Sequence, residues 1–220
     1  MNLKQMLEKT AEQYGKKTAI VSGDQKLSYA ELDEASNRVA NALIKMGVSR
    51  GDRIAMLLSN SPEFAIIYFG IIKVGAIAVP LDTRFRLAEL TSLLNNFQPK
   101  VLISESPTLE PIVPALPRFK SIEHVIDLSS EYKGKLLSYQ EIMATSSPQR
   151  IEVEPEPEDI AHISYTSGPT VHPRGAMLSH QSVVTEAAIS AGGFQQTDKD
   201  VVMLFALPMY HMFGLTATLL

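Results

Sequence analysis

The chain has 220 residues, of which 45% are hydrophobic and 20% are charged. This composition predicts one domain, or two small ones, with a sizeable core, and it excludes a disordered chain. Its 20 Lys and Arg against 24 Asp and Glu give a net charge of −4, so it lacks the basic field of a dedicated nucleic-acid binder. The absence of cysteine excludes disulfides, zinc–thiolate sites and a cysteine nucleophile.

The N-terminal residues mix charges with apolar side chains and contain no signal-peptide core. The longest apolar stretch, 64–81, is interrupted by Lys73 and punctuated by glycines and a proline. A membrane span needs about 20 mostly apolar residues. We therefore expect a buried helix followed by a buried strand here, no transmembrane segment, and a cytoplasmic protein.

Apolar strands alternate with amphipathic helices along the first part of the chain. The spacing of apolar side chains predicts helices at 2–14, 29–46, 62–74 and 87–97. Short apolar runs predict strands at 18–22, 26–28, 53–58, 76–80, 100–103 and 123–128. Ser28 and Glu31 form the pattern of a capping box, and Gly75 is suited to end a helix. The alternation is typical of an α/β fold with doubly wound, mostly parallel sheets and flanking helices.

The second part of the chain contains a long irregular connection. Four prolines within 107–117 predict a loop or irregular crossover, and the Ser-, Pro- and Glu-rich stretch 145–159 predicts an extended connection. Beyond it we expect strands at 160–165 and 201–207 and a helix over 182–189. We therefore divide the chain into a first α/β subdomain at 1–154 and a segment at 155–220 that begins a second one.

The most informative segment runs from Ile163 to His180, directly after a predicted strand. Its polar and glycine residues include Thr166, Ser167, Gly168, Thr170, Arg174 and Gly175. Hydroxyl and backbone N–H groups of such a loop can bind phosphate oxygens, and a guanidinium adds charge-assisted hydrogen bonds. The glycine spacing does not fit the P-loop pattern G-x-x-x-x-G-K-[ST], so an ordinary polar turn between strands is the alternative.

The stretch T-S-G-P-T-V-H-P-R-G at 166–175 resembles T-S-G-[ST]-T-G-x-P-K-G, the phosphate-binding signature of the adenylate-forming (AMP-binding) superfamily. That superfamily includes acyl-CoA synthetases, luciferases and peptide-synthetase adenylation domains. The resemblance spans almost the whole chain, since 27–40, 51–64 and 75–82 look like the family's early elements. The stretch A-L-P-M-Y-H-M-F-G-L at 206–215 resembles a second core motif in its fatty-acyl-CoA synthetase form. The resemblance implies the N-terminal part of the synthetase large domain, most like a long-chain fatty-acid–CoA ligase.

The family reaction that this resemblance implies has two steps. A carboxylate attacks the α-phosphate of Mg-ATP to give an acyl-adenylate and pyrophosphate, and the acyl group then passes to coenzyme A or another thiol. The phosphates would be surrounded by Thr166, Ser167, Gly168, Thr170, Arg174 and Gly175, with Thr170 also at Mg²⁺. His211 would be the catalytic side chain beside the carboxylate, and the acyl pocket would be lined by Tyr210, His211, Phe213 and Gly214. From the residues alone, a packed histidine in an aromatic cluster is the alternative role of His211.

Three positions depart from the phosphate signature. Pro169 removes a hydroxyl and a backbone N–H, Val171 stands where the signature has glycine, and Arg174 replaces lysine. Each lost donor costs about 1–3 kcal/mol. The family's later Y-G-x-T-E motif and its C-terminal domain have no counterpart here, and the chain ends on uncapped apolar residues at 213–220. We therefore expect a piece of a longer protein that is catalytically inactive alone.

Three other functions remain open. The altered loop favours a non-catalytic binding or interaction protein with a degenerate nucleotide site, whereas the intact motif at 208–215 is against it. Enzymes that adenylate aryl or amino acids share much of this region with fatty-acid enzymes. An unrelated doubly wound nucleotide-binding domain is the third alternative. A homodimer follows from family analogy only, and an enzyme for fatty acids would contact membranes only at their surface.

Overall fold

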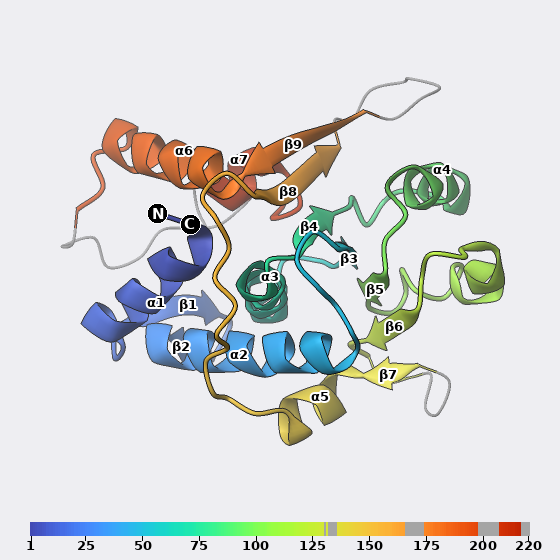
Figure 1. Ribbon diagram of the computed structural model, residues 1–220, viewed down its shortest axis with the longest axis horizontal. Helices are drawn as coiled ribbons and strands as arrows, with labels where there is room; N and C mark the ends of the chain where they lie inside the picture. The colour runs from blue at the N-terminus through green and yellow to red at the C-terminus, as the bar shows by residue number, and fades with distance from the viewer. Residues whose placement is uncertain (130, 132–135, 166–173, 198–206, 217–220) are drawn as a thin grey trace.

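A computed structural model describes residues 1–129, 131, 136–165, 174–197 and 207–216. A seven-stranded sheet forms its centre, in the order β7-β6-β5-β3-β4-β8-β9 (Figure 1). Its strands are β3 (Arg53–Leu57), β4 (Ile77–Pro80), β5 (Val101–Ser104), β6 (His124–Asp127), β7 (Leu137–Ser138), β8 (Ile160–Tyr165) and β9 (Gly175–Ser179). Only the β8–β9 pair is antiparallel among the described strands of this sheet. A separate hairpin joins β1 (Thr18–Ser22) to β2 (Gln25–Ser28).

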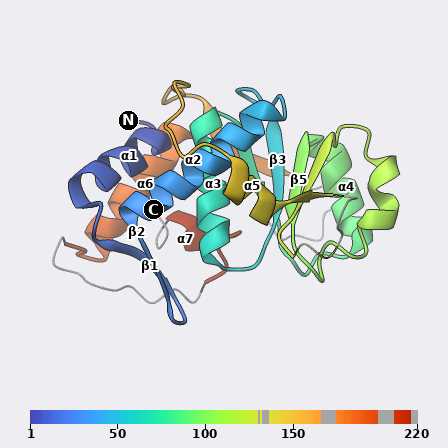
Figure 2. The ribbon, with the colours of Figure 1, turned by 90° about the horizontal axis from the view of Figure 1, so that it is seen from below.

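Helices cover both faces of this sheet (Figures 1 and 2). One face packs against α1 (Leu3–Tyr14), α2 (Tyr29–Lys45), α3 (Pro62–Val74), α5 (Tyr139–Thr145) and α6 (His180–Gly193). The other face packs against α4 (Leu87–Phe97) and the 3₁₀ helix η1 (Val113–Arg118). The short helix α7 (Met212–Gly214) lies in the last described segment. The expected α/β class with a mostly parallel, doubly covered sheet is therefore confirmed.

Local capping signals place the helix ends where the sequence predicts them. Ser28 and Glu31 form a reciprocal capping box at the start of α2. Ser61 accepts a hydrogen bond from the Phe64 N–H at 3.1 Å, directly before Pro62 in the first turn of α3. Gly75 ends that helix with a φ of 74°, a left-handed conformation that glycine adopts without a steric penalty.

Four short elements differ from the predicted pattern. Part of the proline-rich stretch forms η1, and both β7 and α5 lie in a region assigned to no element. The strand β9 lies within the segment expected to form a loop. Of the strand predicted at 201–207, only Leu207 is among the described residues. The division at 154/155 stays a prediction.

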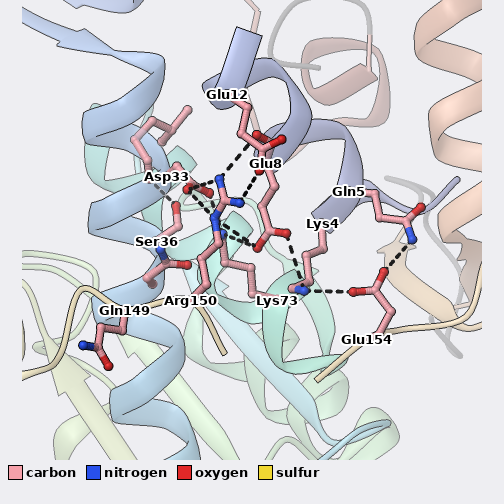
Figure 3. Close-up of polar contacts among 12 residues, drawn as sticks. Lys4, Gln5, Glu8, Glu12, Asp33, Ser36, Lys73, Gln149, Arg150 and Glu154 are labelled. Carbon is pink, nitrogen blue, oxygen red and sulfur yellow. Dashed lines mark hydrogen bonds and ion pairs between the residues drawn. The ribbon is translucent and has the colours of Figure 1, made fainter. Parts of the chain in front are cut away.

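A charged network holds the connection between α5 and β8 against the helices that it crosses (Figures 1 and 3). Lys73, in the buried helix α3, donates to Asp33 at 2.6 Å and to Glu8 at 3.2 Å. Arg150, in the connection, binds Asp33 and Glu12. The charge within the apolar stretch is therefore paired rather than exposed. Within the described ranges, no helix combines the length and apolarity needed to cross a membrane.

Candidate active site

The carboxyl ends of β3, β4 and β8 lie at one edge of the sheet. β3 pairs in parallel with β4, and β4 pairs in parallel with β8, so the three strands end on the same side. In open α/β sheets, ligands bind in the crevice outside the carboxyl ends of the strands. The predicted phosphate segment follows β8, which places its entry at this edge.

Of the predicted phosphate-binding residues, only Arg174 and Gly175 are described. Thr166, Ser167, Gly168 and Thr170 lie outside the described residues, as do Pro169 and Val171. Arg174 is exposed immediately before β9, and Gly175 begins β9 opposite Tyr165. A Cβ at position 175 would lie 2.6 Å from the Ile163 side chain and 3.1 Å from the Tyr165 ring. Glycine is therefore required here by the packing of the hairpin.

Tyr165 anchors the β8 end of this hairpin to α4. Its hydroxyl donates to Asn96 at 2.6 Å, and its ring lies 5.7 Å from the Phe97 ring, centroid to centroid. A pocket of about 300 Å³ lies between α4 and the hairpin, lined in part by Asn96, Tyr165 and Gly175. None of the predicted acyl-pocket residues lines it, so this pocket and the segment around His211 are separate features of the described structure.

The segment at 207–216 is fastened to the end of β3 by Asn60. The Asn60 side-chain amide donates to the Leu207 carbonyl at 2.8 Å, and its side-chain oxygen accepts from the Met209 N–H at 2.8 Å. Asn60 lies between β3 and α3, directly before the cap Ser61. These two bonds bring the second predicted motif to the carboxyl end of β3.

Tyr210 is fastened to the end of β4 by a charged pair. Arg84 binds Asp82 through two nitrogens, at 3.0 and 2.8 Å, and donates to the Tyr210 hydroxyl at 3.2 Å. Burial favours the neutral form of Asp82, but the hydrogen bonds from Arg84 and Tyr210 outweigh it, so the pKa of Asp82 lies below its usual value. Burial and the Asp82 carboxylate raise the pKa of the Tyr210 hydroxyl.

His211 is exposed and heads the short helix α7. Its Nδ1 accepts from the Phe213 N–H at 3.3 Å, and its own backbone N–H donates to the Pro208 carbonyl at 3.1 Å. The bond at Nδ1 places the proton of a neutral imidazole on Nε2. The imidazole is therefore oriented by its own turn, and it is not enclosed among the aromatic rings.

The two remaining predicted residues flank this histidine. Phe213 is half exposed, and its ring meets that of Phe194, at the end of α6, with centroids 6.5 Å apart. Gly214 is buried, and a Cβ there would overlap the Pro208 carbonyl oxygen. Glycine at 214 thus lets α7 fold back on the turn that begins at Pro208.

The structure brings Tyr210, His211, Phe213 and Gly214 together in one turn and fastens that turn to two strand ends. Sequence reasoning missed Asn60, Asp82 and Arg84, which do the fastening. The described residues contain no group of three or more His, Asp or Glu side chains that could hold a metal ion. Thr170, the predicted Mg²⁺ ligand, lies outside the described residues and stays a prediction.

A comparison with known protein families shows which family this chain belongs to. Residues 7–220 match the AMP-binding enzyme family. The chain belongs to that family. The match extends through both motifs that carry the sequence resemblance.

Three similar proteins show how closely the sequence and the fold agree, and how much of each protein this chain covers. Long-chain-fatty-acid–CoA ligase FadD13 of Mycobacterium tuberculosis is 31% identical over 198 residues, which are 90% of this chain and 38% of the relative. ATP-bound MatB of Rhodopseudomonas palustris is 31% identical, with a TM-score of 0.85 over 99% of this chain and 42% of the other. The anthranilate–CoA ligase AuaEII, solved with anthranoyl-AMP, is 26% identical, with a TM-score of 0.82 over 87% and 37%. The chain thus spans about two fifths of the length of these AMP-binding enzymes.

Proposed function

We propose that this chain is the N-terminal part of an acid–thiol ligase that activates a fatty acid with ATP and transfers it to coenzyme A. One observation supports this most directly. Asn60 and Arg84 hold the turn around His211 at the carboxyl ends of β3 and β4, and β8, which leads into the signature segment, runs parallel to β4. Nucleotide and carboxylate have to meet at one place for adenylation, and we propose that they meet beside these strand ends.

The chemistry requires two anions to approach each other. Donors of the loop at Thr166, Ser167, Gly168 and Thr170 would bind phosphate oxygens, and Arg174 and Gly175 would complete the cradle. Mg²⁺ bound with ATP would neutralise further phosphate charge and add Thr170 as a ligand. His211, oriented through its Nδ1, would present Nε2–H to the carboxylate and the adenylate, while Tyr210, Phe213 and Gly214 shape the acyl side.

Two classes of carboxylic acid, fatty acids and aryl acids, are candidates for the substrate. FadD13 is a long-chain-fatty-acid–CoA ligase and supports a fatty acid, whereas AuaEII is an anthranilate–CoA ligase and supports an aryl acid. We favour the fatty acid because the motif at 206–215 has the fatty-acyl form. A cytoplasmic location with contact only at membrane surfaces fits that substrate, and a homodimer follows from family analogy.

The chain alone lacks the later family motifs, so we expect it to catalyse no acyl-dependent ATP–pyrophosphate exchange. Joining residues 1–220 to the part of FadD13 that follows the matched region should restore exchange with fatty acids. His211→Ala should then abolish ATP–pyrophosphate exchange, and His124→Ala, at the start of β6, should leave it largely intact. Exchange driven by benzoate-type acids in preference to fatty acids would favour the aryl alternative. A folded fusion that binds no ATP would favour the non-catalytic protein, in which Pro169 and Val171 disable the loop.

A further inference from the structure

Asn60 makes hydrogen bonds that neither the phosphate loop nor the acyl pocket explains. Its side chain reaches the backbone of Leu207 and Met209, which are 147 and 149 residues away along the chain. The two bonded groups flank Pro208, which has no N–H to offer. A carboxamide presents one donor and one acceptor side by side, so it pairs with these groups as a neighbouring strand would.

We call the Asn60 side chain with its two hydrogen bonds to Leu207 and Met209 the clamp. The backbone on either side of Asn60 is itself held in place. The preceding residue, Ser59, donates its N–H to the Glu105 carboxylate at 2.7 Å, and the following residue, Ser61, caps α3. Leu58, one position earlier, is buried in the core. The Asn60 side chain therefore projects from a short connection that is held on both sides, so its amide is a firm point of attachment.

The bonded segment leads directly to His211. The Pro208 carbonyl, between the two clamped groups, accepts from the His211 N–H at 3.1 Å, and the His211 carbonyl accepts from the Leu215 N–H at 2.9 Å. Tyr210 has a second attachment through Arg84, whereas the His211 side chain is bonded within its own turn, to the Phe213 N–H. We infer that Asn60 is a positioning residue that sets where the His211 imidazole lies.

The catalytic meaning of this inference rests on the proposed function, but the clamp itself can be tested on the 220-residue chain. Asn60 is exposed, so its replacement leaves the core intact. Asn60→Asp keeps the acceptor for Met209 and turns the donor into an oxygen that faces the Leu207 carbonyl. Asn60→Ala removes both. Asn95→Asp makes the same chemical change at an exposed position of α4 and is the matched control.

Amide hydrogen exchange and the imidazole ¹⁵N shifts of His211 are the readouts. Loss of both bonds in Asn60→Ala should speed exchange at Met209 and His211 by about tenfold and should shift the His211 resonances. Asn60→Asp should also shift the His211 resonances but should slow exchange at Met209 relative to Asn60→Ala. Asn95→Asp should change neither readout. Unchanged His211 resonances in both Asn60 variants, or equal Met209 exchange in the natural chain and Asn60→Ala, would overturn the inference.

The active fusion separates this inference from the proposed function. There Asn60→Ala should lower kcat for adenylation several-fold while leaving the KM for ATP nearly unchanged, because the two bonds of Asn60 position the segment that leads to His211. If the His211 resonances shift in Asn60→Ala but His211→Ala leaves ATP–pyrophosphate exchange intact, the positioning by Asn60 is supported and the catalytic role of His211 fails. If His211→Ala abolishes ATP–pyrophosphate exchange while Asn60→Ala affects neither kcat nor the His211 resonances, the positioning role of Asn60 fails and the proposed function stands.

Discussion

Lys73 and Asp33 form an ion pair in the interior, with the ammonium nitrogen 2.6 Å from a carboxylate oxygen. The Lys73 side chain is fully buried, and that of Asp33 is 10% exposed. The second carboxylate oxygen of Asp33 accepts from Arg150 at 3.2 Å. One carboxylate thus joins α2, α3 and the connection that leads to β8 (Figure 3).

Removing the Asp33 charge should cost far more stability than removing an exposed charge on the same helix. Asp33→Asn leaves Lys73 buried with Glu8 as its remaining charged partner among the described residues, and breaking a buried pair costs about 3–5 kcal/mol. Glu34→Gln is the control, because Glu34 is 56% exposed in its pair with Arg38 and exposed pairs contribute less than about 1 kcal/mol. Urea unfolding of the three proteins would measure both. Equal losses in the two variants would contradict a structural role for the network.

His162 should make the protein lose stability as the pH falls. It lies in β8 with both ring nitrogens unpartnered among the described residues, beside the buried Tyr68 ring. Burial lowers the pKa of His162 to about 3, below the value of about 6.5 in an unfolded chain. Between these two values the unfolded state binds the extra proton, so the free energy of unfolding falls by about 1.4 kcal/mol per pH unit.

The variant His162→Leu should remove this share of the pH dependence. Burial also lowers the pKa of His180, to about 4, so that histidine contributes a similar slope in both proteins. Between pH 7 and pH 5, the natural chain should therefore lose about 2 kcal/mol more than His162→Leu. Urea unfolding at the two pH values would test this. Parallel losses would mean that His162 is protonated in the folded protein.

Gly214 and Gly192 should respond in opposite ways to the same substitution. Gly214→Ala places a Cβ against the Pro208 carbonyl oxygen, so the turn around His211 has to open. Gly192→Ala adds a Cβ in open space near the end of α6, where alanine is favoured over glycine by about 0.5–1 kcal/mol. Amide exchange at His211 should therefore quicken only in Gly214→Ala. Thermal unfolding should show no loss for Gly192→Ala, and a loss there equal to that of Gly214→Ala would refute this account of the turn.

Most of the fold could be predicted because its signals are local. Ser28, Ser61 and Gly75 mark helix ends through contacts within a few residues. The antiparallel strand β9 was missed because Gly175 and the polar residues before it resemble a loop, and its pairing with β8 depends on contacts that the sequence does not display.

The candidate site was predicted only in part. Tyr210, His211, Phe213 and Gly214 could be found because they form one continuous motif. Asn60 and Arg84 could not, because their bonds to this motif span 147 and 126 residues. The run S-N-S-P-E around Asn60 signals a helix start, and nothing in it distinguishes a clamp residue from a neighbour of the cap.

Calorimetric titration of Mg-ATP tests the central claim, that the segment after β8 is a nucleotide phosphate site weakened by its departures from the signature. The natural chain would be compared with one that carries Pro169→Thr, Val171→Gly and Arg174→Lys. We predict measurable binding by the reverted chain and binding that is weaker by at least tenfold in the natural chain, since each restored donor contributes about 1–3 kcal/mol. Equal affinities in the two chains, or no binding by either, would contradict the claim.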